Sequence, residues 1–174
     1  YNKEIDILSA TDWFQKGNNA IENKEYDKAI SFLLRAIDLE PDCAVCYFSL
    51  GLAYYGEAKY SKAIPIFVKA IELDIDKRRV NFIMGDAYYR LNNYAKAIQF
   101  YEKAIELGPE FFASTKGYIW LGFSYYMEGD YSKAIPIFVK AIELDIEKPR
   151  AYALLGLIYG EQGKPELKLL NHKK

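Results

Sequence analysis

The chain has almost none of the side chains on which most catalytic and metal sites depend. Its 174 residues include one histidine, His172, and two cysteines, Cys43 and Cys46. A nucleophilic triad would have to use that single histidine, and a zinc site would be short of ligands. No glycine-rich phosphate loop is present, and paired carboxylates such as Glu72 and Asp74 lie where solvated helix ends are expected. We therefore predict a protein that is not an enzyme and that has no metal site and no cofactor.

The chain also lacks a charge excess and a long apolar run. Lysine and arginine number 23 against 24 aspartates and glutamates, a net charge of −1. This balance predicts no general attraction to nucleic acid or to an anionic membrane. Every apolar run is far shorter than the ~18–20 residues that span a bilayer, so we expect no membrane insertion. Because the chain begins with Tyr1, we expect an excised or processed fragment, from which a signal peptide could have been removed.

The two cysteines form a Cys43-x-x-Cys46 pair where a helix is expected to begin. Such a position lowers the pKa of a thiol, so a redox pair is one interpretation, and zinc binding is a weaker one. The favoured interpretation is packing: Cys46 takes a small core position, matched in later repeats by Val80 and Ala151, and Cys43 lies in the preceding loop. The absence of a disulfide-rich pattern favours a reducing compartment, so we predict a cytoplasmic protein.

What the chain does have is an internal repeat. The segment YSKAIPIFVKAIELDI, residues 60–75, recurs letter for letter as residues 131–146, an offset of 71 residues. This offset is one step of 34 and one of 37, and we place the three extra residues near Phe112–Ser114. Duplication with a period of 34 indicates a repeat architecture. Five glycines mark the copies: Gly17, Gly51, Gly85, Gly122 and Gly156.

Apolar residues within each copy follow the spacing of a helix. Residues 63–71 carry apolar side chains at i, i+1, i+4, i+7 and i+8, and no stretch alternates with the period of a strand. Turn signals such as Gly108-Pro109 and Glu128-Gly129-Asp130 separate the helical stretches. Each copy is therefore predicted to be two helices of roughly 12–14 residues joined by a short turn.

The positions that recur resemble the tetratricopeptide repeat (TPR). In the fourth copy the resemblance rests on Tyr118, Leu121, Gly122, Tyr125, Tyr131, Ala134, Phe138 and Ala141. The resemblance implies an all-α, right-handed superhelical solenoid of antiparallel helix pairs, forming one continuous repeat domain. We expect a lead-in at 1–9, full repeats at 10–43, 44–77, 78–111 and 115–148, and a partial fifth repeat with a capping helix at 149–174. In that fifth copy Pro165 and Lys168 replace the expected Tyr and Ala.

The first helix of each copy is apolar on a second face as well. In this family that face lines a concave groove, so the resemblance implies a binding groove here, although packing between repeats would also use such residues. The predicted groove residues are Phe48, Leu52, Tyr55, Phe82, Ile83, Asp86, Tyr89, Arg90, Ile119, Trp120, Phe123, Tyr126, Met127, Leu154 and Leu157.

We predict from this groove a non-enzymatic scaffold that binds an apolar or aromatic-anchored peptide or helix of another protein. Some family members hold the carboxylate of a chaperone tail with lysine, asparagine and arginine side chains, but here only Asn18 and Arg79 fit that pattern. Two alternatives stay open. One is homo-oligomeric assembly by end-to-end stacking of repeats, and the other is an interaction module of a larger enzyme or of a secretion or chaperone component.

Overall fold

The computed structural model describes residues 8–163, and those residues form helices and no strands. Helices of 11 to 14 residues follow one another in pairs, with one five-residue helix, α7, between the third and fourth repeats. The bounds are α1 Ala10–Glu22, α2 Tyr26–Leu39, α3 Ala44–Gly56, α4 Tyr60–Glu72, α5 Lys77–Arg90, α6 Tyr94–Leu107, α7 Pro109–Ala113, α8 Gly117–Met127, α9 Tyr131–Glu143 and α10 Lys148–Glu161.

Each pair is held together where a glycine of its first helix meets a large side chain of its second. A Cβ atom added to Gly51 would lie 2.4 Å from Cε1 of Phe67, and one added to Gly122 would lie 2.6 Å from Cε1 of Phe138. Both phenylalanine side chains are fully buried. The absence of a side chain on the glycine therefore lets the two helices approach until the ring fills the space between them.

The turn that follows the first helix of each repeat uses one residue in the left-handed conformation, seven positions after the recurring glycine. Two of these residues are glycines, and Ala58, with φ of 59°, is the one whose side chain is least suited to that conformation. The residues are Lys24, Ala58, Asn92, Gly129 and Gly163. Because this backbone conformation recurs at the same position, the turns are equally short even where their sequences differ.

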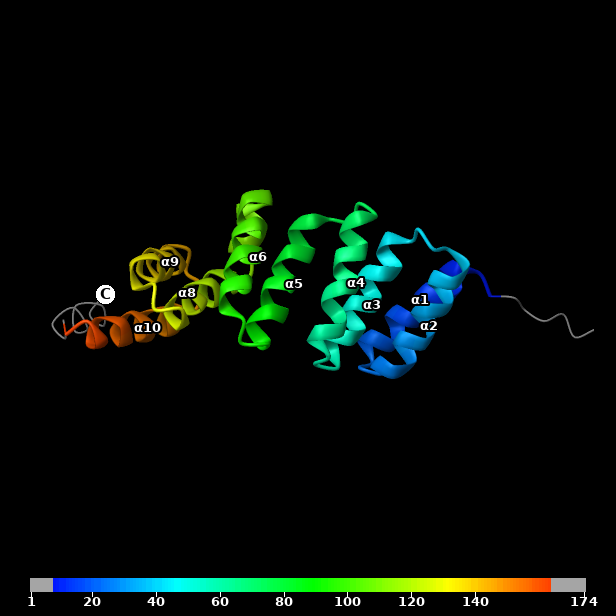
Figure 1. The fold of residues 1–174 in the computed structure, drawn as a ribbon, viewed down its shortest axis with the longest axis horizontal. Helices are drawn as coiled ribbons and strands as arrows, with labels where there is room; N and C mark the ends of the chain where they lie inside the picture. Colours follow the sequence, from blue (N-terminus) through cyan, green and yellow to red (C-terminus); the bar gives the residue numbers. More distant parts are fainter. Residues whose placement is uncertain (1–7, 164–174) are drawn as a thin grey trace, which may run out of the picture. The chain divides into compact units, whose positions relative to one another are not determined.

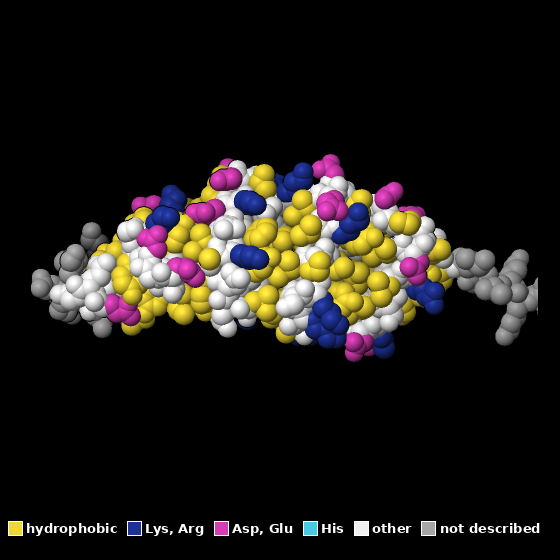
Figure 2. Space-filling model, in the orientation of Figure 1, with side chains coloured by type: hydrophobic (Ala, Val, Ile, Leu, Met, Phe, Trp, Pro, Cys, Tyr) yellow, Lys and Arg dark blue, Asp and Glu magenta, His cyan; other side chains and the backbone are white. Residues whose placement is uncertain are grey.

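The helices group into two compact units, residues 1–80 (unit 1) and 81–174 (unit 2), with the division inside α5. In unit 1 the main contacts run between consecutive helices, α1 with α2, α2 with α3, and α3 with α4, and α1 also contacts α3 (Figure 1). Its core includes Leu33 and Leu50, with Ala20, Ala29 and Ala53 beside them. In the view of Figure 2, hydrophobic side chains cover much of the part formed by α1–α4, and charged side chains lie at its borders.

Unit 2 contains the three-residue insertion that the sequence predicts near Phe112–Ser114. Phe112 and Ala113 belong to α7, Ser114 is its C-cap, and Phe112 is completely buried. Its ring lies 6.0 Å from that of Tyr101 in α6 and 4.9 Å from that of Tyr118 in α8, centroid to centroid. The insertion therefore places an aromatic side chain between α6 and α8.

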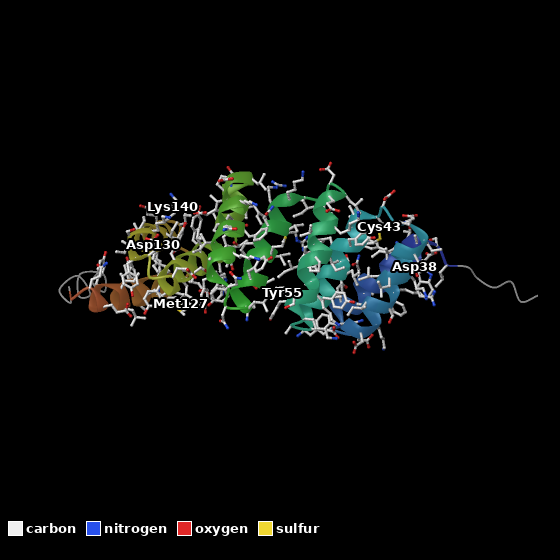
Figure 3. The ribbon with its side chains drawn as sticks, viewed as in Figure 1. Asp38, Cys43, Tyr55, Met127, Asp130 and Lys140 are labelled. Atoms are coloured by element: carbon white, nitrogen blue, oxygen red, sulfur yellow. A yellow bond between two sulfur atoms is a disulfide. The ribbon has the colours of Figure 1, made fainter. Side chains whose placement is uncertain are left out.

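The cysteine pair corrects one expectation from the sequence. Cys46 is 1% exposed, which confirms its core position, but it is joined to Cys43 by a disulfide. Cys43 is the N-cap of α3 (Figure 3). The backbone N–H of Cys46 donates to Sγ of Cys43 at 3.3 Å. The packing-only interpretation was wrong because the first turn of the helix brings the two Cα atoms within 5.3 Å, a normal disulfide separation. The argument for a reducing compartment loses its support accordingly.

Two further findings apply only to the described part of the chain. Between residues 8 and 163 no helix combines the length and the apolar character needed to cross a membrane. The same residues contain no group of three or more His, Cys, Asp or Glu side chains placed to hold a metal ion. The predicted capping helix, with Pro165 and Lys168, lies outside the described residues, as do His172 and most of the predicted lead-in.

Candidate functional site

Unit 2 carries a cluster of four partly exposed aromatic rings, which we call the aromatic surface: Tyr89 of α5 and Trp120, Phe123 and Tyr126 of α8. The ring centroid of Tyr89 lies 5.3 Å from that of Trp120 and 5.9 Å from that of Phe123. The ring centroid of Phe123 in turn lies 5.8 Å from that of Tyr126. The rings touch in tilted and edge-on geometries, which are favourable for aromatic pairs.

The spacing along α8 explains why three of these rings share one face. Trp120, Phe123 and Tyr126 are three residues apart, so they lie side by side on the helix. The opposite face carries Leu121 and Tyr125, which are buried against the rest of unit 2. A helix that is apolar all round leaves one apolar face free when its partner helices cover only the other.

Two charged residues of α10 border the aromatic surface, and sequence reasoning missed both. The guanidinium carbon of Arg150 lies 4.3 Å from the ring centroid of Trp120. Glu161 accepts hydrogen bonds from the hydroxyls of Tyr126, at 2.7 Å, and of Tyr131. The bond to the Glu161 carboxylate, with a smaller contribution from burial, raises the pKa of Tyr126 to about 12. The polar ends of the surface are therefore fixed by contacts within unit 2.

A sequence signal for Arg150 does exist. It lies six residues before Gly156, and Arg79 lies six residues before Gly85. Both arginines stack on an aromatic ring of the preceding first helix, Arg79 on Phe48 at 5.0 Å and Arg150 on Trp120 at 4.3 Å, each measured to the ring centroid. Cation–π contacts of this kind hold a ring in a defined orientation.

Asp86 and Arg90 of α5 form an ion pair, with 3.6 Å between Nε of Arg90 and Oδ2 of Asp86. The hydroxyl of Tyr101 also donates to Asp86, at 3.5 Å. Burial raises the pKa of the Asp86 carboxyl, against the opposing attraction of Arg90. Asp86 is 8% exposed, so its main contacts are internal, whereas Arg90 is exposed to solvent.

The remaining predicted residues of unit 2 divide into exposed and packed ones. Met127 and Leu157 are 46% and 50% exposed. Ile119 is fully buried and Leu154 nearly so, which leaves neither available for contact with a partner. Phe82 packs its ring edge-on against Phe111 and Phe112, so its side chain packs against α7. Ile83, the next residue, is partly buried.

The predicted residues of unit 1 are Phe48, Leu52 and Tyr55 of α3. Phe48 is 9% exposed because it lies against Phe67, with 6.0 Å between the ring centroids, and under Arg79. Tyr55 lies edge-on to Tyr60 at 5.2 Å, and Leu52 is partly exposed. Of these three side chains only Phe48 is buried, whereas Leu52 and Tyr55 remain partly exposed.

Comparison with known families identifies the class of protein that this fold defines. Models of the tetratricopeptide repeat match residues 13–43, 44–75 and 79–111, and a model described as a TPR repeat matches residues 122–163. Together these matches cover most of the chain, so the chain belongs to the tetratricopeptide repeat family. The predicted family and the all-helical repeat fold are confirmed. The TPR fold is a protein-interaction scaffold.

Solved structures with the same fold include YrrB and MamA. YrrB, described as a TPR protein with an unusual peptide-binding site, gives a TM-score of 0.81 at 21% identity, over 94% of this chain and 82% of that one. A MamA structure gives a TM-score of 0.83 at 26% identity, over 94% of this chain and 88% of that one. The structure described as MamA 41-end from Desulfovibrio magneticus RS-1 gives a TM-score of 0.84 at 18% identity, over 94% of this chain and 90% of that one. No curated protein is significantly similar in sequence.

Proposed function

We propose that the chain is a non-enzymatic scaffold whose aromatic surface binds a segment of a partner protein. One observation supports this most directly: Tyr89, Trp120, Phe123 and Tyr126 form a contiguous group of rings that remains partly exposed. Clustered apolar side chains at the surface are typical of interaction sites. We expect this face to correspond to the one that lines the concave groove in the tetratricopeptide repeat family.

The chemistry of the surface favours a segment that offers apolar or aromatic side chains. Three or four such anchors contribute about 1.5–3 kcal/mol each when they are buried. Loss of freedom on association offsets a large part of this, so we expect a net free energy near −8 kcal/mol, which is about micromolar affinity. The exposed charges of Arg90 and Arg150 would set the direction of the segment more than the strength of its binding.

The experiment starts from a random peptide library displayed on phage and selected on the whole protein. Selected peptides are synthesised, and their Kd is measured by calorimetry for the wild type and for the double variant Tyr89→Ala/Trp120→Ala. We expect selected peptides to carry two or more apolar or aromatic residues. The double variant should bind them at least about tenfold more weakly, because truncating buried aromatic anchors typically costs more than 1 kcal/mol each.

A matched control separates the site from general surface effects. Val139→Ala removes a side chain of α9 that is 41% exposed and lies outside the aromatic surface, so it should leave Kd unchanged. Circular dichroism should give equal helicity for all three proteins. Peptides that bind the double variant as tightly as the wild type would refute the proposal. Light scattering over a range of concentrations would show whether self-association competes with peptide binding.

A further inference from the structure

A cleft lies in unit 2, between α6 and α9. Its volume is about 490 Å³, within the range of about 300–1,000 Å³ that is common for ligand sites. Leu121 and Tyr125 of α8 form part of its lining, as do Ile105 of α6 and Ile137 of α9. This cleft shares no lining residue with the aromatic surface.

The polar side chains of the cleft are mostly acidic. Glu102 and Glu106 both belong to α6 and are four residues apart, so their carboxylates share one face of the helix. Glu102 accepts a hydrogen bond from the hydroxyl of Tyr125. This hydroxyl is neutral, so it does not offset the negative charge of the Glu102 carboxylate. Burial, together with this bond, raises the pKa of the Tyr125 hydroxyl, so Tyr125 stays a neutral donor.

The one basic residue of the lining is already engaged. Nζ of Lys133 lies 3.6 Å from Oδ2 of Asp130 and 5.4 Å above the ring centroid of Tyr125. Within residues 8–163 neither Glu102 nor Glu106 has an ion-pair partner. The cleft therefore presents two carboxylates beside an apolar floor, without a matching cation.

Unit 1 contains a natural comparison for this cleft. The α9 wall is identical in sequence to α4, and Leu121 and Tyr125 match Leu50 and Tyr54. The α6 wall differs, because Leu34 of α2 occupies the position of Glu102. The same position is valine in the second and fourth repeats, as Val68 and Val139. An acidic residue there distinguishes the third repeat from the others.

We propose that the cleft between α6 and α9 binds a basic side chain, lysine or arginine, from a segment of a partner protein. The methylene stem of such a side chain would lie on Ile105 and Ile137, which are partly exposed, and its cationic head would reach Glu102 and Glu106. Long basic side chains commonly bury their stems on apolar surface while the charged end stays near water or a carboxylate. The charge of the site is complementary to a cation and unfavourable for an acidic segment.

The test uses an acetylated and amidated pentapeptide, Ala-Lys-Ala-Lys-Ala, and the whole protein labelled with ¹⁵N. Titration followed by NMR should shift the amide signals of Ile105, Leu121 and Ile137, with Kd of about 1 mM for so small a ligand. The matching signals of Ile37, Leu50 and Ile66 in unit 1 should stay in place and serve as the control within the same spectrum. Added salt should weaken the complex, because exposed charge pairs are screened.

Two changes isolate the carboxylates and the charge. Glu102→Leu installs the residue that unit 1 carries at this position, so the variant should fold, and it should bind at least about tenfold more weakly. A peptide with norleucine in place of both lysines keeps most of the stem and loses the charge, and it should lose binding to the same extent. Tyr89→Ala/Trp120→Ala should bind the lysine peptide normally, so this result is independent of the aromatic surface.

Three outcomes would overturn the proposal. Equal binding of the norleucine peptide would mean that the cleft recognises only apolar surface. Equal binding by Glu102→Leu, or shifts confined to residues outside the cleft, would place the cation elsewhere. Tighter binding of a peptide with glutamate in place of lysine would make Lys133 the recognition group and an acidic segment the ligand.

Discussion

At the scale of single residues, stability depends on close pairs such as Gly122 and Phe138. The space that a Cβ atom on Gly122 would need is already occupied by the Phe138 ring, 2.6 Å away. We predict that Gly122→Ala lowers the free energy of unfolding by about 1–3 kcal/mol, the usual effect of overpacking a core. Urea denaturation monitored by circular dichroism measures this change.

Gly160 of α10 supplies the control for that substitution. No atom lies within 4 Å of the place where its Cβ would be, so Gly160→Ala adds a methyl group without a clash. Alanine favours a helix more than glycine does, and the variant should be more stable by up to about 1 kcal/mol. If both alanine variants had the same effect, steric contact with Phe138 would not explain why glycine occupies position 122.

At the scale of elements, the turns between helices offer an internal comparison. Ala58 and Gly129 occupy the same turn position and have φ of 59° and 76°. A residue with a Cβ atom is destabilised by roughly 1–2 kcal/mol in this conformation. Glycine avoids this strain, but its greater freedom in the unfolded chain costs about 0.5–1 kcal/mol. We predict that Ala58→Gly raises the free energy of unfolding by about 0.5–1 kcal/mol.

The reverse change tests the same argument in the other copy. Gly129→Ala should lower the free energy of unfolding by a similar amount, again measured by urea denaturation. No atom lies within 4 Å of a Cβ at this site, so only the backbone conformation can oppose the change. Destabilisation by Ala58→Gly would mean that the entropy of the unfolded chain outweighs the strain of the turn.

The helices were predictable because small and large residues recur at fixed intervals, and the sixteen identical residues gave α4 and α9 equivalent bounds. The spacing of Trp120, Phe123 and Tyr126 likewise indicated their shared face. The burial of Ile119 was not predictable, because it depends on how closely neighbouring helices approach α8. The disulfide and the position of Arg150 over Trp120 required the path of the backbone as well.

At the scale of the whole molecule, the pattern of contacts determines how far a local change can spread. In unit 1 and in unit 2, the main contacts join helices that are neighbours in the repeat order. The stability of such an array is approximately a sum of repeat stabilities and nearest-neighbour terms, so a local defect should act locally. A compact domain with one shared core would lose protection everywhere at once.

We predict that Gly122→Ala speeds amide hydrogen exchange in α8 and α9 while α1 and α2 exchange at nearly the wild-type rate. Exchange measured by NMR or mass spectrometry under native conditions follows each helix separately. Gly51→Ala is the matched variant, because Gly51 meets Phe67 as Gly122 meets Phe138, and it should affect α3 and α4 first. Uniform acceleration across all helices in both variants would show that the chain opens as one cooperative body and that the repeats do not act independently.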